Sequence, residues 1–389
     1  MTQASGRIQA TGRACRIAVI GAGVVGASVA FRLARSKEAR VFIIERSRPG
    51  CGTTSANFAW ANANEKTPRD YFELNRAGLE EHYRLRDELF NGARAGAGAS
   101  WFHPGGNLEW SGDAKSLERL ERRVERLRSW GYAAEWKKAS WVSEYLEPNV
   151  AFPSPKTPVA FFPEEAWVDA PYLANSLVEH AREAGAEMRF GIAVTEIEAE
   201  GGRVSALRFD SGDRLPVDAV VNAAGPEADR VAALLGRTLP LKPSKGMILR
   251  LAAGSPVGRL IHSQHVNLRP DGPEHIAINH GSIDRELGSY DARAKDSLPY
   301  ELLERARAVV PALENAKIEG VRIGVRPMPE DGLPCVGAVP EFPGYYEAVT
   351  HSGVTLGPLL GRLLAREILS GEVDELIALF RPHRFARAR

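Results

Sequence analysis

Two short apolar runs near the start of the chain enclose a stretch with helical periodicity. The first run, Arg16 to Ile20, is rich in β-branched residues and predicts a buried strand. Ser28 to Arg35 repeats apolar side chains at helical spacing, and Val41 to Ile44 predicts a second strand that ends at the acidic residue Glu45. This order predicts a βαβ unit with two parallel strands.

The same reading predicts helices and strands along the rest of the chain. Predicted helices cover Asp70–Phe90, Ser116–Trp130, Ser140–Leu146, Asp169–Gly185, Leu298–Val310 and Gly353–Leu369. Predicted strands cover Glu187–Phe190, Val194–Glu198, Arg203–Phe209, Asp218–Ala224 and Tyr345–Thr350, and a β-rich block runs from Leu239 to Ile283.

Blocks of βαβ type lie at both ends and in the middle of the chain, and two other blocks read as insertions. We therefore predict an α/β fold with a Rossmann-like cofactor domain assembled from residues 15–75, 151–238 and 319–389. An inserted α+β substrate domain, with a mixed or antiparallel sheet, is predicted from residues 76–150 and 239–318.

Charge and cysteine content exclude several classes of protein. The 389 residues carry 50 basic and 49 acidic side chains, so neither a nucleic-acid face nor a polybasic membrane anchor is indicated. Three scattered cysteines favour a reducing compartment over a disulfide framework or a zinc site, and we expect no metal. No apolar stretch is long enough to span a bilayer. Residues 1–14 lack the apolar core of a signal peptide, so we expect a disordered lead-in and a cytoplasmic protein.

The turn after the first predicted strand contains a glycine pattern typical of nucleotide-binding sites. Gly21, Gly23 and Gly26 form a G-x-G-x-x-G pattern that opens the helix. Gly21 permits the tight turn, Gly23 lets a pyrophosphate approach the backbone, and Gly26 lets the helix pack on the strand. The pattern predicts a dinucleotide site. The pyrophosphate of the dinucleotide would lie at the helix N-terminus near Val24 and Val25, and Glu45 would accept hydrogen bonds from its ribose hydroxyls. The alternative is a tight turn in an unrelated α/β sheet.

A second loop, from Pro49 to Asn57, is rich in glycine and hydroxyl side chains. Thr53, Thr54 and Ser55 are either caps of a plain helix N-terminus or a second set of donors for the cofactor.

Four segments together carry a family resemblance. They are Gly21–Glu45, Val220–Pro226, the turn Gly324–Pro334 and the helix start Thr350–Pro358. In this order they resemble the FAD-dependent D-amino acid oxidase family, and are most similar to its glycine oxidase, sarcosine oxidase and D-amino acid dehydrogenase members.

The resemblance implies FAD as the cofactor, and it adds residues to the predicted cofactor site. The added residues are Arg46, Val194, Ala223, Gly225, Arg326, Ser352, Gly353, Val354 and Thr355. The helix that starts at Gly353 would point at the pyrimidine ring of the flavin and favour its reduced anion, although ordinary helix capping by Ser352 and His351 is the alternative.

We expect the FAD to be non-covalent. Gly324 stands where some sarcosine oxidases carry a tethering cysteine, and Cys335 reads as small apolar packing.

Arg326 is the residue that the resemblance places on the substrate carboxylate, because a guanidinium grips a carboxylate with two prongs. The alternative is a structural ion pair with Asp331 or Glu330. His265 is a second candidate catalytic residue, either touching the substrate or serving as an ordinary strand histidine.

Four further positions stay open. His280 is a weaker candidate of the same kind as His265. Lys245 is either on the oxygen-reactive side of the flavin or an exposed turn lysine, and Trp60 and Asn62 either flank the flavin or pack in the core.

The implied reaction oxidises the C–N bond of glycine, an N-substituted glycine or a D-amino acid by hydride transfer to flavin N5, giving an imine that hydrolyses. O2 as acceptor, with H2O2 as product, is the leading hypothesis. The alternatives are a dehydrogenase that reduces a quinone or carrier, a nicotinamide dehydrogenase, and a flavin-binding subunit inactive alone. The sequence indicates a small-molecule substrate and leaves the oligomeric state open.

Overall fold

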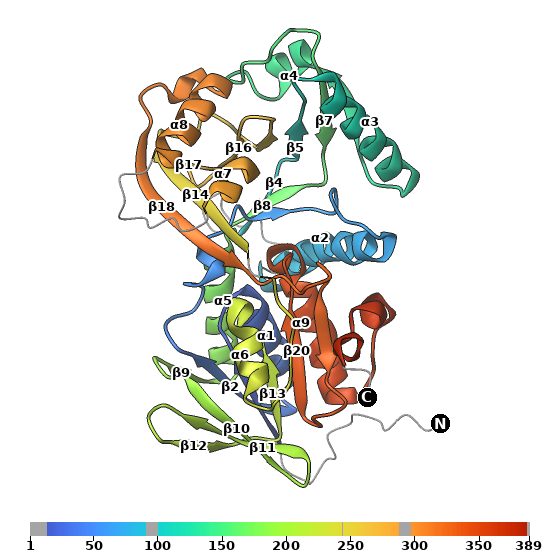
Figure 1. Cartoon of the computed structure of the whole chain (residues 1–389), viewed down its shortest axis with the longest axis vertical. Coiled ribbons are helices and arrows are strands. Elements are labelled where there is room, and N and C mark those ends of the chain that lie inside the picture. The colour runs from blue at the N-terminus through green and yellow to red at the C-terminus, as the bar shows by residue number, and fades with distance from the viewer. Residues whose placement is uncertain (1–13, 91–99, 243, 288–296, 387–389) are drawn as a thin grey trace.

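The computed structural model describes residues 14–90, 100–242, 244–287 and 297–386. Residues 1–13, which make up most of the predicted lead-in, lie outside this range. Figure 1 shows two lobes, with the long helix α2 (Arg69–Phe90) between them. The helices and strands of both lobes come from separated stretches of the chain, as the colours of Figure 1 show.

The lower lobe is built on a six-stranded sheet with the order β19-β20-β13-β1-β2-β9. Its strands are β1 (Cys15–Ile20), β2 (Ala39–Glu45), β9 (Glu187–Phe190), β13 (Ala219–Asn222), β19 (Cys335–Ala338) and β20 (Tyr345–Val349). All neighbours pair in parallel except β19 and β20.

Strand β1 alternates between two cores because successive side chains of a strand point to opposite faces. Ile17 and Val19 pack with the helices on one face, whereas Ala18 and Ile20 pack with a small sheet on the other. The helices are α1 (Val24–Ser36), α5 (Ala170–Glu183) and α9 (Gly353–Ser370), and the small sheet contains β10 (Val194–Glu200), β11 (Arg203–Phe209) and β12 (Arg214–Pro216). Burial on both faces explains the continuous apolar runs of the parallel strands.

The upper lobe is built on an eight-stranded sheet with the order β18-β14-β17-β16-β15-β5-β7-β6. Its strands are β5 (Asn107–Glu109), β6 (Glu135–Lys138), β7 (Pro158–Phe162), β14 (Ser244–Ala252), β15 (Leu260–His262), β16 (Asn267–Pro270), β17 (His275–Asn279) and β18 (Lys317–Arg326). One pair, β5 with β15, is parallel and the rest are antiparallel, so the sheet is mixed.

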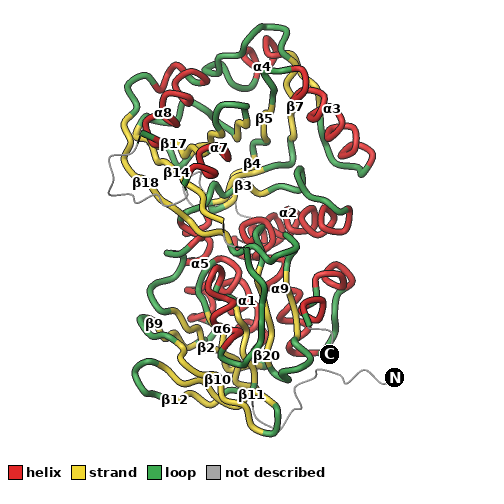
Figure 2. The backbone as a smooth tube through the Cα atoms, viewed as in Figure 1, coloured by secondary structure: helices red, strands yellow, loops and turns green. Residues whose placement is uncertain are grey.

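Helices cover the upper sheet, and a small sheet joins the lobes (Figure 2). The helices are α3 (Ala114–Ser129), α4 (Ala139–Tyr145), α7 (Gly281–Glu286) and α8 (Leu298–Val309). The small sheet contains β3 (Trp60–Ala61), β4 (Phe102–Pro104) and β8 (Ala166–Val168). The short elements η1 (Thr53–Ser55), η2 (Gly225–Glu227), α6 (Ala228–Ala233), η3 (Pro311–Leu313), η4 (Glu375–Phe380) and η5 (Pro382–Phe385) complete the described fold.

The predicted α/β fold with an inserted mixed-sheet unit is confirmed. The sheets also show where the two units exchange strands: β7 and most of β18 pair in the upper sheet, although they lie in the ranges 151–238 and 319–389 that we assigned to the cofactor domain. We propose that the domain borders follow the sheets, so that β7 and β18 belong to the upper lobe.

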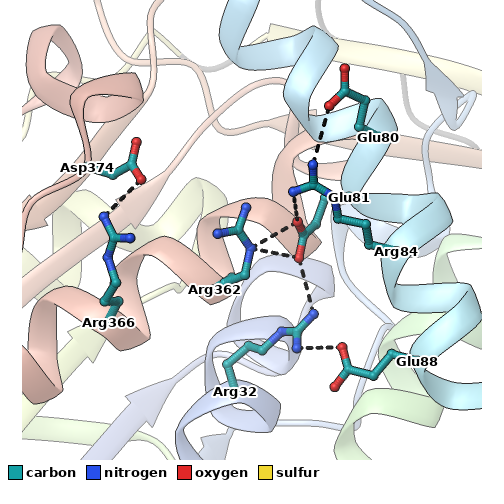
Figure 3. A network of polar contacts seen from close by, with 8 residues as sticks. All are labelled: Arg32, Glu80, Glu81, Arg84, Glu88, Arg362, Arg366 and Asp374. Atoms are coloured by element: carbon teal, nitrogen blue, oxygen red, sulfur yellow. Dashed lines mark hydrogen bonds and ion pairs between the residues drawn. The ribbon is translucent and has the colours of Figure 1, made fainter.

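A buried carboxylate joins three helices of the lower half (Figure 3). Glu81 of α2, with a side chain 1% exposed, accepts from Arg362 of α9 at 3.0 Å and from Arg32 of α1 at 3.2 Å. Arg32 also pairs at 2.7 Å with Glu88, which follows Glu81 by seven residues on α2. Because α1 and α9 are both tied to α2, the N-termini of these two helices are held in a fixed relation to each other.

Candidate active site

The first cavity, of about 730 Å³, opens at the carboxyl ends of the parallel strands of the lower sheet. This edge is where open α/β sheets bind ligands. Thirteen of the residues predicted to bind cofactor line it: Gly21, Gly23, Val24, Val25, Glu45, Arg46, Thr53, Thr54, Val194, Ala223, Gly225, Gly353 and Val354.

The glycine turn is shaped by close backbone approaches. Gly21 has φ 101°, and a Cβ there would lie 2.4 Å from the carbonyl oxygen of Ala223. A Cβ at Gly26 would lie 1.9 Å from the carbonyl oxygen of Gly21, so Gly26 serves the packing and does not line the cavity. A Cβ at Gly23 would meet only Thr54 Oγ1, at 3.1 Å, and the space beyond it belongs to the cavity.

Two helices begin at this cavity. Helix α1 starts after Gly23, and Thr54 Oγ1 accepts from the backbone N–H of Val24 at 3.1 Å. Helix α9 starts after Ser352. The free N–H groups and the dipole of a helix N-terminus favour a negative charge. The cavity therefore offers two places for anionic groups of a nucleotide.

Glu45 ends β2 with a fixed carboxylate. Its two oxygens accept from the backbone N–H of Ala22 at 3.0 Å and of Ser47 at 2.9 Å. Arg46 also lines the cavity and pairs with Glu227 at 3.0 Å. Ser55 lines neither cavity, because its hydroxyl donates to the carbonyl of Cys51 at 2.9 Å.

A second cavity, of about 940 Å³, adjoins the first. The two share five lining residues, namely Thr53, Asn57, Pro327, His351 and Val354. Ser352, Thr355 and Arg326, all predicted as cofactor residues, line the second cavity and not the first. The two cavities therefore meet at a shared wall.

Arg326 lies at the end of β18, with its side chain 31% exposed. Its Nη2 donates to Asp284 Oδ2 of α7 at 2.5 Å, and its Nη1 donates to the carbonyl of Lys245 at 3.3 Å. The two partners suggested by the sequence pair elsewhere: Asp331 with Arg384 at 2.7 Å and Glu330 with Lys242 at 3.4 Å. Two of the five guanidinium N–H groups are used in these bonds, which leaves donors for a carboxylate in the cavity.

Four strands of the upper sheet present a row of polar side chains to the second cavity. Glu109, His262, Asn267 and Asn279 are register partners across β5, β15, β16 and β17, and all four line the cavity. Asn267 Nδ2 donates to Asn279 Oδ1 at 3.1 Å. These four side chains form the side of the second cavity that faces the upper sheet.

The histidine in this row is His262, not His265. His265 lies exposed in the turn between β15 and β16, where it bonds to Gln264, and it lines neither cavity. The alternation of β15 and β16 turns His262 and Asn267 to one face. Sequence reasoning missed His262 because the strand Leu260–His262 is only three residues long; the apolar pair before it was the available signal.

His262 is a neutral imidazole at physiological pH. Burial, helped by the positive charges of Arg123 and His280, lowers its pKa to about 3. Its Nδ1 lies 2.7 Å from Asn107 Oδ1, an acceptor, so Nδ1 carries the proton and Nε2 is left as an acceptor.

An aromatic wall fixes the His262 ring. The rings of Trp60 and His262 lie 4.1 Å apart, and Trp60 Nε1 donates to Glu165 Oε2 at 2.7 Å. Glu165 also accepts from the Tyr132 hydroxyl at 3.2 Å. Burial raises the pKa of Glu165 to about 8, so this carboxyl is protonated at neutral pH.

The remaining candidates occupy clear positions. His280 and Asn62 line the second cavity, whereas Lys245 is exposed and lines neither. Burial, together with the positive charges of Lys66 and Arg326, lowers the pKa of His351 to about 4, so the shared wall carries a neutral histidine. Cys335 is buried, its Sγ donates to Glu347 Oε2 at 3.1 Å, and it lines neither cavity.

The match to a family model decides which group of proteins this is. The model described as FAD dependent oxidoreductase (DAO) matches residues 16–367. The chain belongs to this family. Its cofactor is FAD, and the residues of the first cavity fit that group: the glycine turn leaves room where Gly23 faces the cavity, and the N-termini of α1 and α9 would offer N–H groups to its phosphates and other anionic groups.

Named relatives and solved structures agree with the family. A glycine oxidase of Geobacillus kaustophilus is 28% identical over 357 residues, which cover 90% of this chain and 91% of that protein. The crystal structure of glycine oxidase from that organism superposes with a TM-score of 0.83 at 26% identity, covering 95% of this chain and 99% of that one. Iminodiacetate oxidase (IdaA) from Chelativorans sp. BNC1 gives a TM-score of 0.80 at 26% identity, covering 94% and 99%. The hydrogen cyanide synthase subunit HcnC of Pseudomonas aeruginosa is 27% identical over 413 residues, which cover 93% of this chain and 95% of that protein.

The described residues contain neither a membrane-spanning helix nor a cluster of metal ligands. None of the helices that the structure describes is both long and apolar enough to cross a membrane. Over the same ranges, no group of three or more His, Cys, Asp or Glu side chains is placed to hold a metal ion.

Proposed function

We propose that this FAD-dependent oxidoreductase oxidises the C–N bond of a small amino acid with a free carboxylate: glycine, an N-substituted glycine or a D-amino acid. The observation that carries the proposal is the position of Arg326, which faces a cavity that shares a wall with the cofactor cavity. The named oxidases of glycine and iminodiacetate among the similar structures support it.

In this proposal Arg326 holds the substrate carboxylate. Asp284 fixes the guanidinium, and Asp284 is itself fixed because its Oδ1 accepts from the backbone N–H of Met247 at 2.9 Å. The substrate amine faces the polar row of the upper sheet, where Nε2 of His262 accepts an N–H. This contact accepts an N–H of an ammonium as readily as one of an amine, and His262, with a pKa of about 3, is too weak a base to remove the proton, so positioning supplies most of the rate.

Bound FAD supplies the two-electron oxidant. The chain contributes the N-terminus of α9, whose N–H groups and dipole stabilise negative charge at the shared wall. Neutral His351 adds no charge there at physiological pH. The rings of Trp60 and His262, which contact each other at a tilt of 40°, limit the space open to water on the sheet side.

We also propose that the FAD is non-covalent. A Cβ at Gly324, the tether position of the resemblance, would lie 2.2 Å from the carbonyl oxygen of Ala56, so no side chain fits there. Acid precipitation is expected to release the yellow colour into the supernatant. Colour retained in the pellet would show a covalent bond.

The electron acceptor in this proposal is O2, and the product is H2O2. The second candidate is a dehydrogenase that reduces another carrier, and it is favoured by the similarity to HcnC, which is named as a subunit of a synthase. Peroxide formed in air by the isolated protein, in proportion to amine consumed, supports the oxidase. Turnover only with an added quinone or dye supports the dehydrogenase.

Anaerobic bleaching of the flavin tests the reaction itself. Glycine, sarcosine and small D-amino acids are expected to bleach the flavin far faster than the matching amides or decarboxylated amines, because only the acids offer a carboxylate to Arg326. Equal rates with plain amines would replace this proposal by a general amine oxidase.

A further inference from the structure

Positive side chains outnumber negative ones around the second cavity. Its basic residues are Lys66, Arg119, Arg123, Arg126, Arg285 and Arg326, and its acidic residues are Glu65, Glu109 and Asp284. The whole chain, by contrast, has a formal net charge of +1. The excess of positive charge is therefore a property of this cavity and not of the protein surface in general.

The three carboxylates of the cavity are already paired. Glu65 binds Arg123 at 2.7 Å, Glu109 also pairs with Arg123, and Asp284 binds Arg326. Glu165, near Lys66, offers no negative charge at neutral pH because burial keeps it protonated. Glu65 and Glu165 raise the pKa of Lys66, but burial outweighs both, and within the described residues none of these acids forms an ion pair with Lys66 or Arg126.

Lys66 and Arg126 are partly buried cations without an acidic partner. Within the ranges that the structure describes, neither side chain makes an ion pair or a hydrogen bond, and Nε of Arg126 is fully buried. Their neighbours are aromatic: Nζ of Lys66 lies 6.0 Å from the ring centre of Tyr71, and the Arg126 guanidinium lies 5.5 Å from that of Trp130. Burial lowers the pKa of Lys66 and outweighs the opposite effect of Glu65 and Glu165, so the charge of Lys66 is only partly compensated.

Two other basic residues of the cavity differ from this pair. Arg119 donates to Ser116 Oγ at 2.6 Å, and both Arg119 and Arg285 are exposed, so water solvates their charges. A partly buried cation that lacks such solvation is costly unless an anion joins it. Lys66 and Arg326 line the second cavity together with His351 of the shared wall, and the charges of both cations lower the pKa of His351.

We propose that Lys66 and Arg126 form a second anion subsite, and that the substrate is an amine with two acidic groups. One carboxylate binds Arg326, as in the proposed function on which this inference rests. The second acidic group binds Lys66 and Arg126. Substrates of this class are N-carboxymethyl amino acids and acidic D-amino acids.

Binding of unreactive ligands tests the subsite without turnover. Diglycolate carries two carboxylates and an ether oxygen in place of the amine, so it cannot be oxidised at a C–N bond, and methoxyacetate is its one-carboxylate counterpart. Titration of the flavin absorbance of the holoenzyme is expected to give a Kd at least tenfold lower for diglycolate. Equal Kd values would overturn the subsite.

Variants locate the preference. Lys66→Met and Arg126→Met are each expected to raise the Kd of diglycolate tenfold or more while changing that of methoxyacetate less than twofold. Arg122→Met is the matched control. Arg122 lies exposed on α3, four residues before Arg126; it pairs with Glu118 and does not line the cavity. A full tenfold preference in both cavity variants contradicts the assignment, and should one variant fail to fold, the other and the wild-type comparison still decide.

Flavin reduction separates this inference from the function. Iminodiacetate is expected to bleach the flavin at lower concentration than sarcosine, which differs by one carboxylate. If sarcosine and iminodiacetate reduce the flavin equally well, the second subsite fails and the proposed function stands. If neither amine reduces it but diglycolate binds tightly and depends on Lys66, the function fails and the subsite stands.

Discussion

A Cβ at Gly246 would lie 2.5 Å from Nη2 of Arg326. Gly246 on β14 is the register partner of Gly324 on β18, and the Arg326 side chain crosses back over this point toward Asp284. The absence of a side chain at Gly246 is what lets the guanidinium lie against the sheet. The placement of Arg326 is thus set by three elements, β14, β18 and α7.

Removing the guanidinium is expected to abolish efficient use of amino acids. Arg326→Leu loses a partly shielded partner of the substrate carboxylate, at a cost of about 2–5 kcal/mol, or about 1.5 to 4 decades in kcat/KM. Flavin content should stay normal, since Arg326 does not line the first cavity. Steady-state kinetics and the flavin-to-protein absorbance ratio check this. Lys317→Leu, at the far exposed end of β18, is the control and should match wild type; loss of flavin in Arg326→Leu would instead reveal a structural role.

A smaller change tests the position of Arg326 and not its presence. In Gly246→Ala the added methyl group meets the guanidinium, which must move away from Asp284. We expect a rise in KM of about tenfold for carboxylate substrates, with flavin content unchanged. Reduction kinetics across substrate concentration measure this. Kinetics equal to wild type would mean that the guanidinium need not lie over Gly246.

Gly23→Val is expected to lose FAD. The valine side chain would meet Thr54 Oγ1 at 3.1 Å and enter the cavity where a pyrophosphate must approach the backbone. Flavin per protein after purification, by absorbance, is the measurement. Gly320→Val on β18, where a Cβ meets nothing within 4 Å, should keep full flavin. Normal flavin in Gly23→Val would place the phosphates elsewhere.

Glu165 makes stability depend on pH. Its folded pKa, about 8, is raised above the ordinary value of 4.5, so its contribution to stability is fully present below pH 4.5 and is lost as the pH rises toward 8. Within this window the free energy of unfolding should fall by up to about 1.4 kcal/mol per pH unit from this group. Glu165→Gln keeps the neutral form and should flatten that fall. Urea unfolding of the holoenzyme at pH 5.5 and pH 8 measures it, and parallel changes in both proteins would show that Glu165 ionises normally.

The sequence predicted the elements of the lower lobe well because their signals are local. Apolar runs, helical spacing and Gly21 placed β1 and α1 to within a few residues. The roles of the glycine turn and Glu45 could be predicted because the spacing of the three glycines and of the acidic residue is typical of a dinucleotide-binding βαβ unit.

Long-range pairing was not accessible in the same way. The partner of Arg326, Asp284, is 42 residues away, and the packing of α7 against β14 brings it there. His262 needed the register of β15 with β16, and Lys66 and Arg126 needed the fold of α3 over the loop after β3. The two strands β7 and β18 crossed the predicted domain borders because sheet membership depends on partners that are distant in sequence.

The three-helix junction at Glu81 has a consequence for how the holoenzyme is made. Because Arg32 and Arg362 are anchored to one carboxylate, we expect the walls of the first cavity to keep their arrangement without FAD. Loading would then need only the binding of FAD and no refolding of the chain. Apoprotein stripped of its flavin should accept flavin analogues by simple mixing, which makes the reduction potential of this enzyme adjustable without changing a residue.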